Sequence, residues 1–170
     1  DVNAVPICLD TQDTEEIIAT IKNIAPAFGG INLEDISAPR CFEIEERLKA
    51  MLDIPVFHDD QHGTAIVVLA GIINGLRVTG KKKEDCKVVV NGAGSAGVAI
   101  TKLLLTYGFK HVTMCDREGI IGKDYPNLNW MQKKMTEVTN LENASGTLAD
   151  ALKGSDIFVG VSAPNIVTPE

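Results

Sequence analysis

Short apolar runs alternate along the chain with segments in which apolar residues recur every three to four positions. The runs predict strands at residues 5–9, 30–33, 54–57, 87–91, 111–115 and 156–161. The recurring pattern predicts helices at residues 14–25, 39–52, 63–76, 95–107, 130–139 and 148–152. Strands that alternate with helices from end to end are typical of an α/β fold with a parallel sheet.

Two of the predicted helices carry more specific signals. Before the helix at 14–25, Asp13 and Glu16 have the spacing of a capping box. The helix at 63–76 is apolar almost all round, which predicts burial between layers or at a domain junction. We place the domain boundary just after it, at about residues 79–85.

Composition narrows the class of protein. The 170 residues are 45% hydrophobic and 23% charged, as in a globular protein with a sizeable core, and a net charge of −7 disfavours a general role on nucleic acid. No apolar stretch approaches the roughly 18 residues of a membrane span, and no signal pattern is visible, so we expect a cytoplasmic location without a membrane partner. The cysteines lack the paired spacing of a zinc or redox motif and predict reduced, structural thiols: Cys8, Cys41, Cys86 and Cys115.

A glycine triplet, Gly92, Gly94 and Gly97, follows one predicted strand and opens the next predicted helix. In a dinucleotide-binding turn the first glycine allows a tight turn, the second lets the backbone approach a pyrophosphate, and the third lets helix and strand pack closely. Asp116 ends the following predicted strand, where an acidic side chain accepts hydrogen bonds from the adenosine ribose. The segment predicts a nucleotide site; the alternative is a glycine-tolerant turn that binds nothing.

Two pairs of carboxylates, Glu34 with Asp35 and Asp59 with Asp60, each follow a predicted strand. If a crossover helix joins these strands, they run parallel and their C-terminal ends lie at the same edge of the sheet. Four carboxylates gathered there repel one another unless a cation neutralises them, and oxygen ligands suit Mg²⁺ or Mn²⁺. The pairs predict a divalent metal site; the alternative is that one acid of each pair caps a helix and the other is solvated.

His58 and His62 have the i, i+4 spacing of a zinc-hydrolase helix. We reject a zinc site because Glu does not follow the first histidine and the segment leaves a predicted strand. Each histidine is instead interpreted as an active-site neighbour or a satisfied buried group.

Four segments of the chain resemble the malic enzyme family, in order and along the whole length: residues 28–36, 57–65, 90–97 and 160–164. The match to the compact bacterial-type members is close. The resemblance implies a parallel-sheet part that binds substrate and metal, residues 1–80, and a Rossmann-like, doubly wound dinucleotide-binding domain, residues 81–170, both incomplete. It also implies oxidative decarboxylation of malate to pyruvate and CO₂, with reduction of NAD or NADP.

The resemblance assigns roles to individual residues. It implies that Glu34, Asp35 and Asp60 ligate Mg²⁺ or Mn²⁺ and that Asp59 is a supporting active-site neighbour. It implies contacts of the dinucleotide with Gly92, Gly94, Ser95, Ala96, Gly97, Asp116, Arg117 and Ser162. Asp116 slightly favours NAD, whereas Arg117 could pair with the 2′-phosphate of NADP, so the choice of cofactor stays open.

Members of this family use a tyrosine and a lysine as general acid and base, and both lie N-terminal to the segment that matches Asp1. We therefore expect an internal piece of a longer, homo-oligomeric enzyme, dimeric or larger, that binds metal or nucleotide weakly and does not turn over malate alone. Two alternatives stay open. A non-catalytic nucleotide-sensing module would not need the carboxylate pairs, and another dehydrogenase, of the amino-acid or folate type, would share only residues 87–161.

Overall fold

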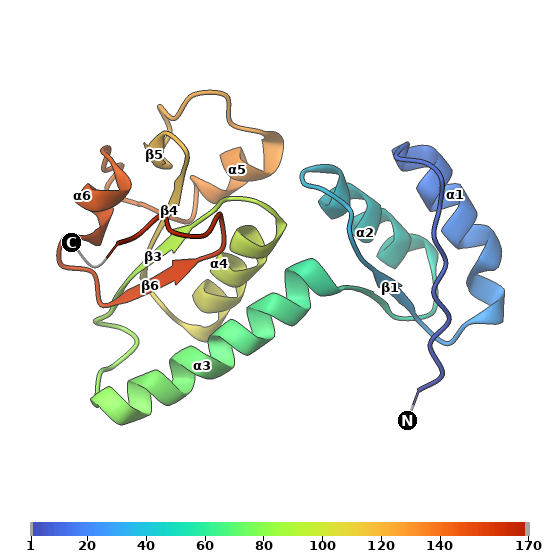
Figure 1. Cartoon of the computed structure of the whole chain (residues 1–170), viewed down its shortest axis with the longest axis horizontal. Helices are drawn as coiled ribbons and strands as arrows, with labels where there is room; N and C mark the ends of the chain where they lie inside the picture. The colour runs from blue at the N-terminus through green and yellow to red at the C-terminus, as the bar shows by residue number, and fades with distance from the viewer. Residues whose placement is uncertain (1, 169–170) are drawn as a thin grey trace.

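The computed structural model describes residues 2–168, which form two lobes joined by a long helix (Figure 1). We call residues 2–58 the N-lobe and residues 64–168 the C-lobe. The helix that runs between the lobes belongs to the C-lobe by its contacts, since it packs along a second helix there.

The N-lobe contains two parallel strands and the helices that cover them. The register pairs Ile31 with Val56 and Leu33 with His58, so both strands end at the same edge, as predicted. The core beneath them is formed by isoleucine, leucine and valine side chains of both strands and both helices. The elements are α1 (Thr14–Ile24), η1 (Ala25–Ala27), β1 (Ile31–Leu33), α2 (Arg40–Met51) and β2 (Val56–His58).

Two details of the N-lobe differ from the sequence-based expectations. Residues 5–9 form no strand, because within the described residues no other strand lies beside them to accept and donate the ladder hydrogen bonds. Asp13 does cap α1 by accepting from the backbone N–H of Glu15 and Glu16. The capping box is incomplete, because the Glu16 carboxylate accepts from the Thr11 hydroxyl rather than from the backbone of Asp13.

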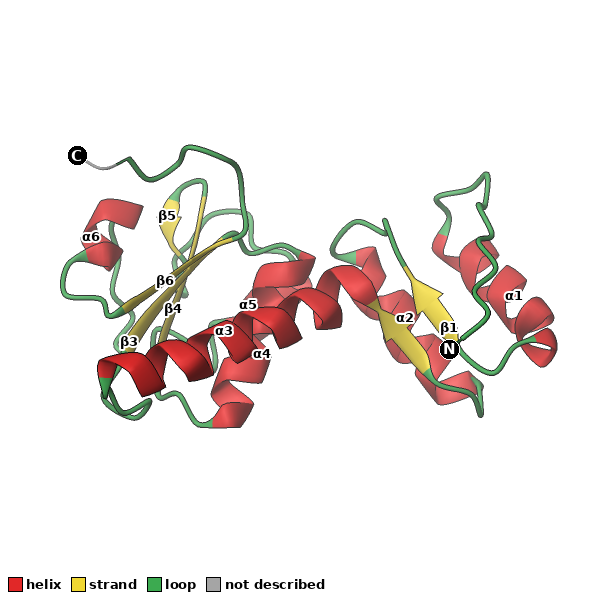
Figure 2. Cartoon of the chain, turned by 60° about the horizontal axis from the view of Figure 1, so that its bottom comes forward, coloured by secondary structure: helices red, strands yellow, loops and turns green. Residues whose placement is uncertain are grey.

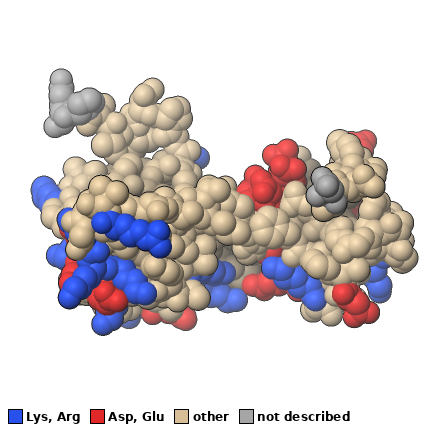
Figure 3. Space-filling model, turned by 90° about the horizontal axis from the view of Figure 1, so that it is seen from below, with Lys and Arg blue, Asp and Glu red and all other residues tan. Residues whose placement is uncertain are grey.

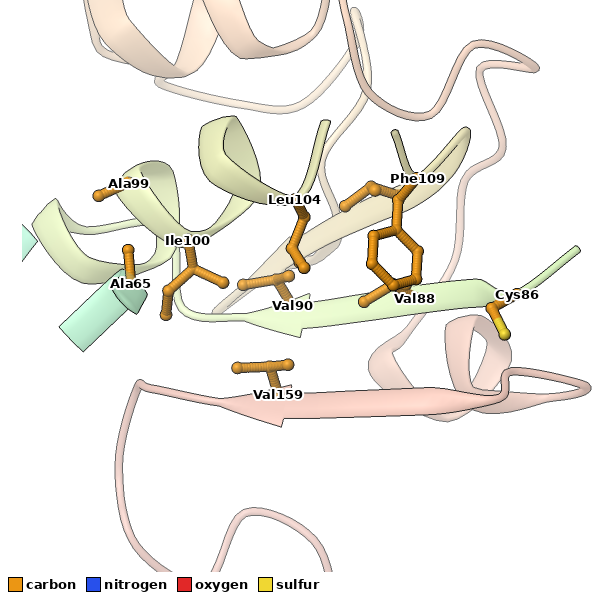
Figure 4. Close-up of a cluster of buried hydrophobic side chains, with 10 residues drawn as sticks. Ala65, Cys86, Val88, Val90, Ala99, Ile100, Leu104, Phe109 and Val159 are labelled. Atoms are coloured by element: carbon orange, nitrogen blue, oxygen red, sulfur yellow. The ribbon is translucent and has the colours of Figure 1, made fainter. Parts of the chain in front are cut away.

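The C-lobe is built on a four-stranded sheet with helices on both faces, and the strand order is β5-β4-β3-β6 (Figure 2). On the central strand, Val88 and Val90 point to α3 and α4 (Figure 4). Val89 packs with residues of α6 on the opposite face. The elements are α3 (Thr64–Thr79), β3 (Lys87–Asn91), α4 (Ser95–Tyr107), β4 (His111–Asp116), β5 (Gly119–Ile120), α5 (Trp130–Met135), α6 (Leu148–Leu152) and β6 (Ile157–Gly160).

Most of the C-lobe follows the sequence-based expectation. Helix α4 has the predicted bounds and ends at Gly108, which adopts a left-handed φ of 110°. The structure adds β5, a two-residue strand antiparallel to the end of β4. It also shortens α5, which ends at Met135 rather than near Thr139.

The expectation that the apolar helix at 63–76 is buried is wrong. Only one side of α3 packs against α4, and the opposite side leaves Ile66 and Val67 55% and 67% exposed. The expectation that no stretch approaches the length of a membrane span is also wrong, because with the turn before it the continuous helix Asp59–Thr79 is long and apolar enough to cross a membrane by length and composition. One such helix is weak evidence for a span, because a helix packed on a protein core passes the same test.

Candidate functional site

The glycine triplet forms the predicted turn between β3 and α4. Gly92 has a φ of 115°, and a Cβ there would lie 2.9 Å from the backbone carbonyl of Val161. A Cβ on Gly97 would lie 1.7 Å from the carbonyl oxygen of Gly92, so no other residue fits. Gly94 differs, because a Cβ there meets nothing within 4 Å. Packing therefore requires the first and third glycines, and the second faces open space.

The open space lies at the N-terminus of α4. Gly94 occupies the cap position with extended backbone, and no side chain caps the helix. The first N–H groups of a helix have no partner within it, and together with the helix dipole they form a site for an anion. Ser95, Ala96 and Gly97 make up this first turn.

Asp116 lies at the end of β4, beside the glycine turn. Its Oδ1 accepts a 2.9 Å hydrogen bond from the backbone N–H of Arg117, whose side chain is exposed. The Gln132 side chain, from α5, lies between the two features, with Nε2 3.3 Å from the Ala93 carbonyl oxygen and 3.5 Å from Asp116 Oδ2. Sequence reasoning missed Gln132, although its capping-box spacing from Asn129 was visible.

Ser162 is held close to the same turn. The buried Asn91 side chain donates a 2.9 Å hydrogen bond from Nδ2 to Ser162 Oγ, and the Val161 N–H donates to the Asn91 carbonyl oxygen. Asn91 was not singled out from the sequence, because a polar residue that ends an apolar strand gives no signal of its partner. It ties the loop after β6 to the glycine turn.

The carboxylate pairs lie at the shared C-terminal edge of β1 and β2, and Figure 3 shows acidic side chains gathered where the lobes meet. Asp35 has a left-handed φ of 56°, and its N–H donates a 3.0 Å hydrogen bond to Asp60 Oδ2. Asp59 and Asp60 begin a single π-helical turn, Asp59–Gly63, which leads into α3. Such turns are rare in proteins, and those that occur are often found at functional sites.

The predicted ligands Glu34, Asp35 and Asp60 are solvent-accessible and offer only oxygen atoms, which fits Mg²⁺ or Mn²⁺. The backbone of Asp35 contacts the Asp60 carboxylate, but within residues 2–168 no three acidic, histidine or cysteine side chains converge tightly enough to enclose an ion. The Asp59 carboxylate lies over its own turn, since a Cβ on Gly63 would be 2.4 Å from Asp59 Oδ1.

The two histidines have separate environments. His58 ends β2 and is fully buried, and neither ring nitrogen has a hydrogen-bond partner in the described structure. Burial lowers the pKa of His58 and so favours a neutral ring. This holds although Asp60 Oδ2, whose charge raises the pKa, lies 4.0 Å from Nδ1. His62 instead lies 2.6 Å from Glu45 on α2. The geometry gives no support to a zinc site.

The lobes meet next to the glycine turn. Phe42, from the start of α2, packs in one cluster with Ala93, Val98 and Met114 of the C-lobe. The core is therefore continuous from the helix behind the carboxylate edge to the turn that opens α4.

Two family models match the chain. Residues 61–168 match the NAD-binding domain of malic enzyme, and residues 7–49 match its N-terminal domain. The chain is 59% identical to an NAD-dependent malic enzyme of Geobacillus stearothermophilus, over 99% of the chain and 35% of that protein. It is 43% identical to an NADP-dependent malic enzyme of Halomonas elongata, over 99% of the chain and 40% of that protein.

A solved structure agrees with these matches. The crystal structure of the NAD-dependent malic enzyme from Thermotoga maritima superposes with a TM-score of 0.95 at 50% identity, over 99% of the chain and 45% of that protein. The chain spans less than half the length of each of these three relatives.

Proposed function

The chain belongs to the malic enzyme family, and from that premise we propose that it supplies the metal and dinucleotide sites for oxidative decarboxylation of malate to pyruvate and CO₂. The observation that carries the proposal is the glycine turn, closed by packing at Gly97 and open at Gly94, beside an edge where Asp35 and Asp60 meet. A nucleotide-sensing module would need the first of these features and not the second.

Each part of the chain has a role in this proposal. The N–H groups at the start of α4 hold the pyrophosphate, and Asp116 accepts hydrogen bonds from the ribose. Asn91 holds Ser162 against the turn, so the loop after β6 lies beside the bound dinucleotide. Glu34, Asp35 and Asp60 hold Mg²⁺ or Mn²⁺, which supplies charge stabilisation to the substrate oxygens during oxidation and decarboxylation.

We assign the cofactor as NAD or NADP, with a slight preference for NAD. Relatives with either cofactor in their names are similar along the whole chain. Asp116 suits the ribose hydroxyls of NAD, and the exposed Arg117 side chain suits the extra phosphate of NADP.

The 170 residues alone are expected to bind these groups without turning over malate. Both tyrosines have partners within the C-lobe, since the Tyr125 hydroxyl accepts a hydrogen bond from the backbone N–H of Glu118 and the Tyr107 ring lies under the Lys83 ammonium. We propose that proton transfer uses residues outside this chain. We also propose that residues 1–80 and 81–170 divide the binding of substrate and dinucleotide, in a cytoplasmic homo-oligomer.

The test is a turnover assay of the intact protein with L-malate and Mn²⁺, with NAD and NADP in separate reactions and a chelator control. We expect reduction of the dinucleotide and formation of pyruvate, and loss of both when the metal is removed. A competent preparation that ignores malate, or that works equally well with chelator, would overturn the proposal.

A further inference from the structure

Glu45 is a buried carboxylate at a position that stability alone does not explain. It lies in the middle of α2, and its side chain is 7% exposed. Removing a carboxylate from water is costly, and buried ion pairs commonly add little net stability compared with apolar residues of the same size. An apolar residue would satisfy the packing of α2 as well, so the charge at this position calls for another explanation.

Glu45 makes two contacts through one oxygen atom. Its Oε1 lies 2.7 Å from Lys49 Nζ, one turn along the same helix, and 2.6 Å from His62 Nε2. Lys49 is 46% exposed, so its pairing resembles an ordinary surface contact. The bond to His62 differs, because it joins α2 to the π-helical turn between the lobes. A carboxylate only accepts, so His62 Nε2 carries the proton and donates it.

The turn that His62 belongs to also carries Asp60. At its beginning, Asp60 Oδ2 accepts from the Asp35 N–H, which ties the turn to the end of β1. Near its end, His62 is held by Glu45 and lies against the Phe57 ring, with 5.5 Å between ring centroids. Asp60 therefore projects from a short segment that is anchored on both sides, by β1 and by α2.

We propose that Glu45 is a positioning residue for the divalent metal, acting through His62 to fix the turn from which Asp60 reaches the ion. The inference rests on the proposed function, since it requires that Asp60 be a metal ligand. A residue that orients a ligand-bearing segment typically changes metal affinity by about ten- to a hundredfold when removed. The orientation matters here because the three carboxylates do not converge by themselves.

The experiment measures Mn²⁺ affinity of the intact protein by electron paramagnetic resonance of the free ion, without substrate or turnover. Glu45→Ala and His62→Ala are each expected to raise the Mn²⁺ Kd about tenfold or more. Because both residues act as one unit, the double variant should bind no more weakly than either single variant. Glu45→Gln should stay within about threefold of wild type, since its amide oxygen still accepts from His62.

Two matched controls on α2 separate positioning from a general effect on folding. Lys49→Ala removes the other partner of the same oxygen, and Leu48→Ala opens a cavity at a fully buried site on the same helix. Leu48→Ala is expected to lower Tm, and both variants should keep the wild-type Mn²⁺ Kd. Dinucleotide affinity should be unchanged in all of these variants.

Each result decides between the alternatives. Wild-type Mn²⁺ affinity in Glu45→Ala, additive losses in the double variant, or an equal loss in Leu48→Ala would overturn the positioning role while leaving the proposed function intact. A wild-type protein that binds no Mn²⁺ would instead remove the metal site itself and this inference with it.

Discussion

The glycine turn and the carboxylate edge are two sites built by different means. The turn is made of backbone from neighbouring residues, and steric exclusion fixes it: a Cβ on Gly97 has no room. The carboxylate edge is made of side chains that follow two strands, and the hydrogen bond between Asp35 and Asp60 joins residues 25 positions apart. The first site is complete without a ligand. In the second, the described carboxylates do not converge on one point by themselves.

The largest effect should come from the glycine turn, where two alanine substitutions separate folding from binding. Gly97→Ala places a methyl group against the Gly92 carbonyl and should lower the free energy of unfolding by about 3 kcal/mol or more. Gly94→Ala meets no protein atom, so it should keep the wild-type Tm but lose most of its dinucleotide affinity. Urea denaturation and fluorescence titration with NADH measure the two effects. Retention of NADH affinity in folded Gly94→Ala would mean that the open space is not the pyrophosphate site.

The carboxylate edge should respond in the opposite sense, with loss of binding and little change in folding. Asp60→Asn keeps an oxygen that can accept from the Asp35 N–H, so Tm should change little. The lost charge should weaken Mn²⁺ binding by about a hundredfold. Isothermal titration with Mn²⁺ checks this, with NADH affinity as the control that must not move. Unchanged Mn²⁺ binding would exclude Asp60 as a ligand.

A smaller effect is expected at the ribose end of the nucleotide site. Asp116→Ala should weaken NAD binding by about tenfold, because ordinary hydrogen bonds to a charged acceptor are worth about 1.5 kcal/mol or more. NADP binding should change less, and Arg117→Ala should show the reverse preference. The ratio of the two Kd values in each variant is the measurement. Equal losses for both cofactors in both variants would contradict the assignment of these residues to the ribose.

The smallest effect is expected far from both sites, where Asp156 joins β6 to the start of β3. The Lys81 ammonium, followed by the backbone N–H of Lys87, lowers the pKa of Asp156 from 3.8. The folded state therefore binds fewer protons than the unfolded state, so this stabilisation is present above pH 3.8 and is lost as the pH falls below it.

Asp156→Asn should reduce the free energy of unfolding slightly at pH 7 and by less at pH 3. Urea denaturation at both values measures it, and Mn²⁺ and NADH affinities at pH 7 should not change. A larger loss at pH 3 than at pH 7 would show that the sign is wrong.

The difference between the sites also explains how far the sequence could be interpreted. The unit from β3 to β4 could be predicted nearly to the residue, because its glycines, its helix cap at Gly108 and its acidic end depend on local geometry. The shared C-terminal edge of β1 and β2 could also be predicted, because the rules for crossover connections apply to elements that are neighbours in sequence.

The missing parts depend on contacts between distant residues. The bond between Glu45 and His62 spans 17 positions, and the reach of Gln132 to Ala93 spans 39. Neither pair has a local pattern. The strand expected at residues 5–9 was wrong because an apolar run does not specify a partner strand, and the burial of α3 was overestimated because apolar composition does not determine which side is covered.

Helix α3 connects the N-lobe rigidly to the body of the C-lobe. Its 16 residues extend about 24 Å from the π-helical turn Asp59–Gly63, and its contacts with α4 make it part of the C-lobe. A tilt of about ten degrees between α3 and the N-lobe would displace the C-terminal end of α3 by about 4 Å. Asp60 lies in the turn at the N-terminal end of α3, where the same tilt displaces it least. The buried cluster of Phe42 with Ala93, Val98 and Met114 crosses the same junction and opposes such a tilt, so the packing between the lobes holds the far end of α3 as well as Asp60 in place.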